Sequence, residues 1–250
     1  MSLTTVLSVS VRPDRMSAYE TGVQRLARQA EEQKEAFEWA AYQVVAGALG
    51  TLHFVSSASD WATFGAREPI DALVRRILGD AAGAQLLEEL GQCIVGERYV
   101  VGRDRPDLSC PPPENAPRTA MATVATLQAR PGGEDACEEL IRKVAQAIPQ
   151  VNDPRRMVAC QTFIGDPRVY WIVTPLADVA ELDRMLPVEE LLTKAFGAEG
   201  ALIHRTALAA IDRFERHMTM FRPELSHASW AGSVIGLPSQ RAAAAHPAVH

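Results

Sequence analysis

The sequence repeats itself, and this repeat constrains the fold more than any other feature. Residues 97 to 109 read ERYVVGRDRPDLS and residues 215 to 226 read ERHMTMFRPELS. Upstream of both stretches the match continues at a constant shift of 118 positions. Matched pairs include Val6 with Val124, Glu20 with Glu138, Leu73 with Leu191 and Gly79 with Gly197. Before the RP-x-LS tails the shift falls to 117, which we interpret as a single-residue deletion in the last strand. The pattern indicates a tandem duplication.

The order of elements within each half follows from its apolar periodicity. Residues 4 to 12 alternate as a strand does, and a stripe of apolar residues predicts a helix from Ser17 to about Lys34. A hairpin over residues 37 to 57, two helices over residues 70 to 94 and a last strand complete the half. This order, βαββαβ with an extra helix before the last strand, is that of a ferredoxin-like unit.

The duplication and the proline-rich segment between its halves predict the domains of the chain. Residues 1 to 109 form ferredoxin-like repeat 1 and residues 122 to 227 form repeat 2. Between them, residues 110 to 121 contain four prolines and are predicted to be a linker. Residues 228 to 250 lack a core-forming pattern and are predicted to be a C-terminal extension.

A ferredoxin-like unit leaves one face of its sheet uncovered, and two units can cover each other. The predicted fold class is therefore α+β, with two tandem repeats packed sheet to sheet as an intrachain pseudo-dimeric barrel. On element order and duplication, residues 4 to 109 and 122 to 226 resemble the dimeric α+β barrel superfamily. The resemblance implies a small-molecule cavity between sheet and helices or inside the barrel. Members include cofactor-free monooxygenases of the antibiotic-biosynthesis type, stress-responsive barrel proteins and haem proteins of the chlorite dismutase type.

Composition excludes several classes of protein. The net charge of −6 and the absence of a basic run disfavour nucleic-acid binding. The sequence contains no run of about 18 apolar residues, so no membrane span is predicted. Four cysteines without C-x-x-C spacing are too sparse for a disulfide framework, so we expect a cytoplasmic protein with reduced thiols. Further homo-oligomerisation stays open.

Polar and aromatic residues on the predicted strands are the candidates for ligand binding. Gln43 and Gln161 occupy the same position in the two repeats, where each is either a paired structural amide or a group that orients a ligand. Trp171 is the third candidate, and as a strand aromatic it also fits a core position.

Candidate catalytic residues are His217, His53 and Tyr42, since histidine is the usual general base at neutral pH. No H-x-x-x-H or H-E-x-x-H spacing occurs, so no metal site is predicted. His204 and His217 both lie in the C-terminal repeat, where chlorite dismutase-like proteins hold haem, but neither matches that family's motif. No cofactor is predicted, and haem remains a further alternative.

The recurring Glu-Arg pairs resemble an acid and base acting together. Glu97 and Arg98, like Glu215 and Arg216, are neighbours on a predicted strand and therefore point to opposite faces. The Glu and the Arg of one pair therefore cannot act together at one site. The RP-x-LS stretches that follow place a proline, which donates no ladder hydrogen bond, where each last strand ends. We interpret them as holding the two repeats together, with any chemistry where the halves differ.

Two functions of different classes follow. The first is a protein that binds a small apolar or aromatic molecule, with cofactor-independent monooxygenation as the activity that the resemblance implies. The second is a non-catalytic scaffold whose duplication makes the pseudo-dimer obligate. A cavity with convergent polar groups would favour the first, and a filled interior the second.

Overall fold

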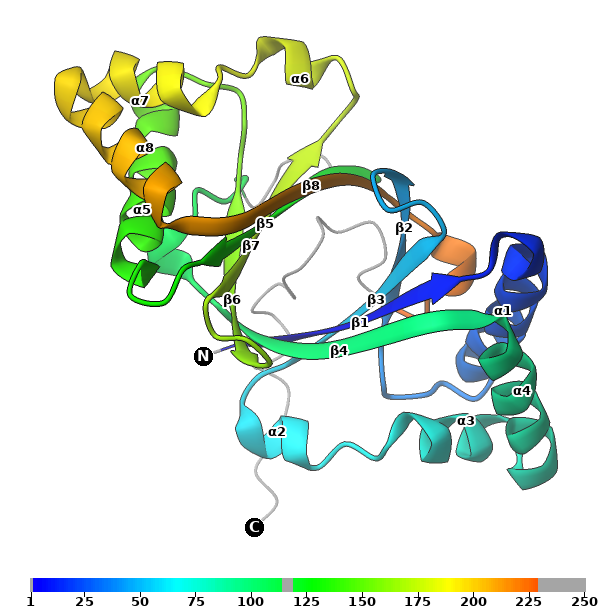
Figure 1. The fold of residues 1–250 in the computed structure, drawn as a ribbon. Helices are drawn as coiled ribbons and strands as arrows, with labels where there is room; N and C mark the ends of the chain where they lie inside the picture. Colours follow the sequence, from blue (N-terminus) through cyan, green and yellow to red (C-terminus); the bar gives the residue numbers. More distant parts are fainter. Residues whose placement is uncertain (1, 114–118, 229–250) are drawn as a thin grey trace. The chain divides into compact units, whose positions relative to one another are not determined.

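The computed structural model describes residues 2–113 and 119–228. Part of the predicted linker, residues 114–118, and nearly all of the predicted C-terminal extension, residues 229–250, lie outside the described residues. Within the described chain each repeat contains the expected elements in the expected order (Figure 1).

The first repeat alternates strands and helices as its periodicity predicts. Its elements are β1 (Leu3–Val11), α1 (Met16–Glu32), β2 (Ala40–Ala46), β3 (Thr51–Ala58), α2 (Trp61–Gly65), α3 (Ile70–Leu78), α4 (Asp80–Cys93) and β4 (Ile94–Asp104). Short 3-10 turns cover Pro13–Arg15 and Pro106–Leu108.

The second repeat has the same series. Its elements are β5 (Met121–Ala129), α5 (Glu134–Gln150), β6 (Val158–Ile164), β7 (Val169–Leu176), α6 (Glu181–Arg184), α7 (Val188–Phe196), α8 (Ala198–Ala210) and β8 (Ile211–Phe221), followed by a 3-10 turn at Pro223–Leu225.

All eight strands belong to one hydrogen-bonded series in the order β1-β3-β2-β8-β5-β7-β6-β4, which closes as a barrel. The β1–β3 and β5–β7 pairs are antiparallel and have the same register, since Leu7 faces Phe54 in one and Ala125 faces Ile172 in the other. The predicted α+β class, with two ferredoxin-like repeats in an α+β barrel, is confirmed.

The chain divides into two compact units. Unit 1 comprises Met1–Val100 with Met220–His250, and unit 2 comprises Val101–Thr219. The division falls inside β4 and β8, so the end of each last strand belongs to a different unit from its beginning. In unit 2, for example, Val101 to Asp104 of β4 pair with β6.

The arginine of each RP-x-LS stretch ties its unit together. In unit 2, Arg105 forms two hydrogen bonds of 2.7 Å to Glu138 of α5 and a third of 2.7 Å to Gln161 of β6. In unit 1, Arg222 pairs with Glu20 of α1 at 2.8 Å and also donates to Gln43. Because Arg105 comes from repeat 1 and Glu138 from repeat 2, these contacts support the interpretation that the stretches hold the repeats together.

The single-residue deletion lies at the beginning of α8, so its predicted position in the last strand is wrong. Gly83 and Gly200, which are 117 positions apart, play the same role: an added Cβ would approach the preceding helix within 2.6 Å and 2.2 Å. After this point β4 and β8 have equal lengths of 11 residues. The structural counterpart of Arg216 is therefore Tyr99, and that of Glu215 is Arg98.

Candidate functional site

Unit 2 contains a cavity of about 340 Å³ between its strands and its helices. Buried apolar residues form its inner part, with Ala125 and Leu127 on β5, Ile141 and Val144 on α5, and Met157 before β6. This volume is at the low end of the range of small-molecule sites, about 300–1,000 Å³. The cavity suits a compound of a few rings or a short aliphatic chain.

The local sequence explains why apolar side chains gather here. Along β5, Thr123, Ala125 and Leu127 are two residues apart and all line the cavity, because alternate residues of a strand face the same side. On α5, Leu140, Ile141 and Val144 recur at helical spacing and lie opposite them.

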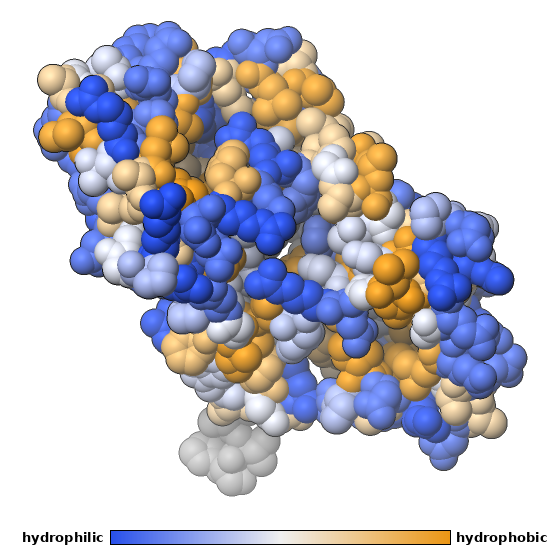
Figure 2. Space-filling model, viewed as in Figure 1, coloured by the Kyte–Doolittle hydropathy of each residue, from blue (hydrophilic) through white to orange (hydrophobic). Residues whose placement is uncertain are grey.

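The outer part of the cavity is formed by α8 and the first half of β8. Leu208 and Phe214 line it and are 55% and 52% exposed. Figure 2 shows hydrophobic residues among hydrophilic ones on the surface near these elements. A ligand can therefore reach the buried inner part from this side.

Arg155 is the buried charged group of the cavity, with 9% exposure. Its Nε donates to the Asp153 carboxylate at 2.7 Å, and its Nη2 donates to the same carboxylate and to the Leu186 carbonyl oxygen. Burial alone would raise the pKa of Asp153, but hydrogen bonds from Arg155 and from the Leu186 N–H outweigh it and lower that pKa. The carboxylate thus stays charged and fixes the guanidinium.

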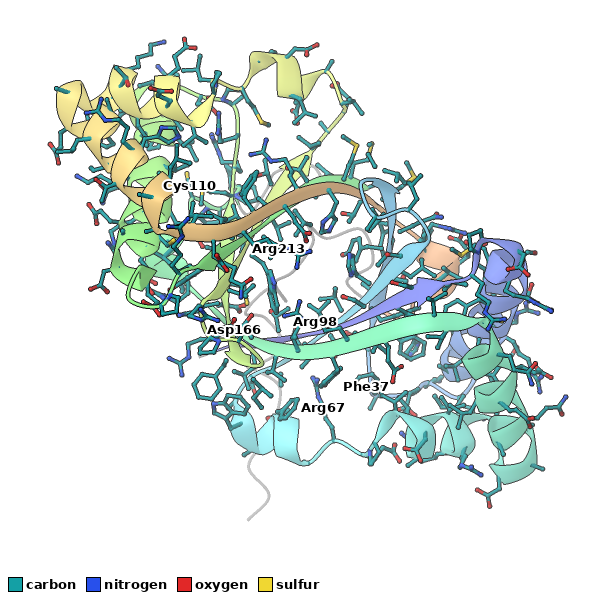
Figure 3. The ribbon with its side chains drawn as sticks, viewed as in Figure 1. Phe37, Arg67, Arg98, Cys110, Asp166 and Arg213 are labelled. Atoms are coloured by element: carbon teal, nitrogen blue, oxygen red, sulfur yellow. The ribbon has the colours of Figure 1, made fainter. Side chains whose placement is uncertain are left out.

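Arg216, on β8, is the second cationic group that lines the cavity. Its guanidinium lies 5.5 Å from the centre of the Phe214 ring. Partial desolvation, and then the nearby Arg155, lower the pKa of Arg216. As the strand alternation predicts, Glu215 does not share its site but accepts a 2.9 Å hydrogen bond from Arg213, labelled in Figure 3.

His204, on α8, is the third basic residue of the lining and is half-buried. Two guanidinium groups, one imidazole and the side chains of Thr123 and Thr174 thus line a space whose other walls are apolar. Such a site can enclose an apolar body, interact with a negative charge and move a proton through the imidazole.

The candidates of unit 1 lie elsewhere. Tyr42 is 2% exposed, burial raises its pKa, and its ring is 5.5 Å from that of Phe221. It pairs across β2 and β3 with His53, whose Nδ1 is 2.9 Å from the Ser8 hydroxyl. Gln43 accepts a hydrogen bond from Arg222. The structure thus brings Tyr42 and His53 together and gives Gln43 a structural partner.

The candidates of unit 2 also lie away from the cavity. Gln161 accepts from Arg105 and donates to the Tyr170 hydroxyl at 3.1 Å. Trp171 lies against Gly102, where an added Cβ would come within 2.7 Å of its ring. Burial lowers the pKa of His217, which is on the face of β8 opposite to Arg216. Roles for these six residues stay predictions.

Sequence reasoning did not select the two arginines. Arg155 lies in a loop without periodicity, and the Glu-Arg repeat made Arg216 look like a shared structural position. One signal could have found Arg155: repeat 1 has Phe37 at the matching position, an exchange of an aromatic residue for a charge. Across the described ranges 2–113 and 119–228, no group of three or more His, Cys, Asp or Glu side chains could hold a metal ion.

The fold is an α+β barrel of two ferredoxin-like repeats, with the cavity in unit 2. No protein-family model and no curated protein matches the sequence. Among solved structures, an anthrone oxidase-like protein is 13% identical with a TM-score of 0.57, covering 94% of this chain and 97% of its own. A candidate monooxygenase from Lactobacillus acidophilus NCFM is 6% identical (TM-score 0.52, 88% and 93% covered).

Chlorite dismutase from Candidatus Nitrospira defluvii, solved in complex with imidazole, is 10% identical with a TM-score of 0.52, covering 89% and 92% of the two chains. These similarities confirm the resemblance to the dimeric α+β barrel superfamily at the level of the fold. No helix among the described residues is long and apolar enough to cross a membrane.

Proposed function

We propose that this protein binds a small apolar or aromatic molecule in the cavity of unit 2 and oxidises it as a cofactor-independent monooxygenase. The observation that carries the proposal is the cavity itself, an apolar space of about 340 Å³ with three convergent basic side chains. Sites of this kind are the usual ligand sites of enzymes. The similarity to an anthrone oxidase-like protein supports the same reaction class.

The chemistry requires little from the protein beyond a dry pocket and a base. In an electron-rich substrate with an acidic methylene group, His204 accepts a proton from the carbon, and the resulting carbanion reacts with dioxygen. The methylene becomes a carbonyl, one oxygen atom enters the product and the other leaves as water. The substrate supplies all the electrons, so no external reductant is needed.

The test compares wild type with a variant whose cavity is filled by the side chains that repeat 1 uses at the same positions. The triple variant Ala125→Leu, Met157→Trp, Ile172→Phe copies Leu7, Trp39 and Phe54. With anthrone as substrate, we expect oxygen uptake above the uncatalysed background for wild type and at least a tenfold lower rate for the filled variant.

Two controls accompany this test. Phe54→Ile makes the reverse exchange in unit 1 and should keep the wild-type rate. His204→Gln should lower the rate while leaving binding unchanged. If the filled variant oxidises anthrone as fast as wild type, the cavity is not the site, and if wild type gives only the background rate, this substrate class is wrong.

The two alternatives have their own tests. A scaffold would bind no apolar compound in the cavity. For haem, His204 and Met157 are the axial-ligand candidates among the described lining residues, but a cavity of about 340 Å³ is small for a four-pyrrole macrocycle. We expect added haem to give no protein-dependent Soret band. A band that disappears in His204→Gln would favour the haem alternative.

A cytoplasmic location remains part of the proposal. All four cysteines are free thiols, and burial raises the pKa of Cys160 and Cys137, which makes both unreactive. Free thiols of this kind are typical of proteins in reducing compartments.

A further inference from the structure

The two arginines of the cavity lack a balancing negative charge. Asp153 carries one charge and is already bonded to Arg155. Arg216 forms no ion pair or hydrogen bond within the part of the chain that the structure describes, and its one contact of note is the face of Phe214. The cavity lining therefore has an excess of one positive charge beside apolar walls.

Only some of the N–H donors of Arg155 have an acceptor among the described residues. Nε and Nη2 are occupied by Asp153 and the Leu186 carbonyl oxygen, whereas no described residue accepts a hydrogen bond from Nη1. Hydrogen bonds between a charged donor such as Nη1 and an anionic acceptor are stronger than neutral ones. The geometry leaves this donor available to a group that enters the cavity.

Placing two guanidinium groups close enough to depress a pKa is unfavourable unless something separates them. Arg155 is among the causes that lower the pKa of Arg216. An anion between two arginines turns this repulsion into attraction, and the planar fork of a guanidinium matches a carboxylate particularly well. Arg216 is itself exposed, so the anion would bind near the mouth and the apolar part would extend inward.

Repeat 1 supports the assignment by contrast. At the positions of Arg155 and Arg216 it has Phe37 and Tyr99, neither of which can bind an anion by charge. The two arginines thus occur in unit 2, which contains the cavity, and have no counterpart at the matching positions of repeat 1.

We propose that the ligand of this cavity is a small amphipathic anion, an aromatic or aliphatic compound whose carboxylate or phenolate is bound by Arg155 and Arg216 while its apolar part fills the space lined by Ala125, Ile141 and Met157. This inference deepens the binding half of the proposed function and rests on it. It excludes neutral hydrocarbons as the preferred ligands.

The experiment compares two probes of nearly equal shape, 2-naphthoate and the neutral 2-naphthalenemethanol, by calorimetric titration at low and high salt. We expect wild type to bind the carboxylate at least tenfold more tightly, with a preference that decreases as salt rises. Arg216→Gln should remove most of this preference and leave binding of the alcohol unchanged.

Arg213→Gln is the matched control, because it removes the same charge from the same strand but on the opposite face. It should keep the preference. Arg155→Lys, which keeps a charge beside Asp153 but loses the fork, should reduce the preference several-fold in a protein that still folds.

Each outcome is decisive. Equal binding of both probes by wild type overturns the anion assignment and leaves the cavity as a binding site. A preference that survives in Arg216→Gln, or that Arg213→Gln loses equally, also overturns it. If neither probe binds, the proposed function fails and this inference fails with it.

Discussion

The two units share one backbone plan, yet three positions that line the cavity of unit 2 hold larger side chains in unit 1, whose own pocket of about 540 Å³ lies elsewhere, between α1 and α4. In unit 1, Phe37 and Trp39 have rings 6.3 Å apart, and the Arg67 guanidinium lies 5.2 Å from the Phe37 ring (Figure 3). In unit 2 the matching positions hold Arg155 and Met157. A paired arginine and a flexible methionine thus line the cavity of unit 2 at the positions where unit 1 has two packed aromatic rings.

The same loop also shows how a charge was introduced into the interior. After the first helix of each repeat a carboxylate accepts the backbone N–H two residues later, Glu35 from Phe37 and Asp153 from Arg155. In unit 1 the countercharge is Arg76, which comes from α3. In unit 2 it is Arg155 itself, so the residue that balances the carboxylate is also the one that lines the cavity.

The largest effect is expected when this buried pair is broken. Arg155→Met leaves Asp153, whose side chain is 0% exposed, without its countercharge. Removing one partner of a buried pair costs about 3–5 kcal/mol. Urea unfolding should show this loss, while the matched change Phe37→Met should cost only about 1 kcal/mol. Equal effects of the two changes would mean that the asymmetry has no energetic basis.

The strand-end arginines provide the next comparison. Arg105 forms two 2.7 Å hydrogen bonds with Glu138, which the Tyr170 hydroxyl also contacts at 3.0 Å, whereas Arg222 forms one bond of 2.8 Å with Glu20. Hydrogen bonds to charged groups contribute about 1.5–3 kcal/mol. We expect Arg105→Ala to destabilise the protein more than Arg222→Ala, as measured by the urea midpoint. The reverse order would contradict the structure.

Adding carbon atoms to the two interiors distinguishes a filled core from a cavity directly. Val9, 1% exposed in unit 1, has no room to grow, so Val9→Leu should cost about 1–3 kcal/mol. Ala125→Leu adds atoms to the cavity of unit 2 and should change stability by less than about 1 kcal/mol. Thermal unfolding measures both, and an equal penalty would show that unit 2 is as tightly packed as unit 1.

A smaller effect is expected in acid. The folded state lowers the pKa of Asp153 and also that of Glu138, for which the hydrogen bond from Arg105 is the main cause. Their stabilisation is therefore fully present above the ordinary carboxyl pKa values, about 4, and is lost as pH falls through the lowered values. Stability measured from pH 6 to pH 3 should fall less steeply in Asp153→Asn. An unchanged slope would show that this carboxylate does not contribute.

The fold could be predicted from the sequence because it depends on patterns that extend over many residues. Alternation in residues 4 to 12, the stripe on the first helix and the repeat at one register all report on burial, which dominates folding. The site depends on a few side chains, and their role follows from the smaller or uncharged groups that surround them in the folded protein. No periodicity shows that Met157 is smaller than Trp39 at the matching position, or that no carboxylate among the described residues pairs with Arg216.

The shifted deletion illustrates the same limit. Matching letters placed Arg216 opposite Arg98 and made the two look equivalent, while the contacts of Gly83 and Gly200 place the offset one helix earlier. Only the backbone geometry shows that Arg216 replaces Tyr99, and this replacement is what gives unit 2 its second cavity arginine.

Binding in the unit 2 cavity can be observed directly in the methyl signals of the seven methionines, labelled with carbon-13 and followed by NMR during titration with 2-naphthoate. Met157 is the only methionine among the described residues that line the cavity, and the half-buried Met16 packs against a core cluster of unit 1. We expect the Met157 signal to shift in a saturable way while the Met16 signal stays in place. A saturable shift of Met16 with no change at Met157 would contradict binding in this cavity.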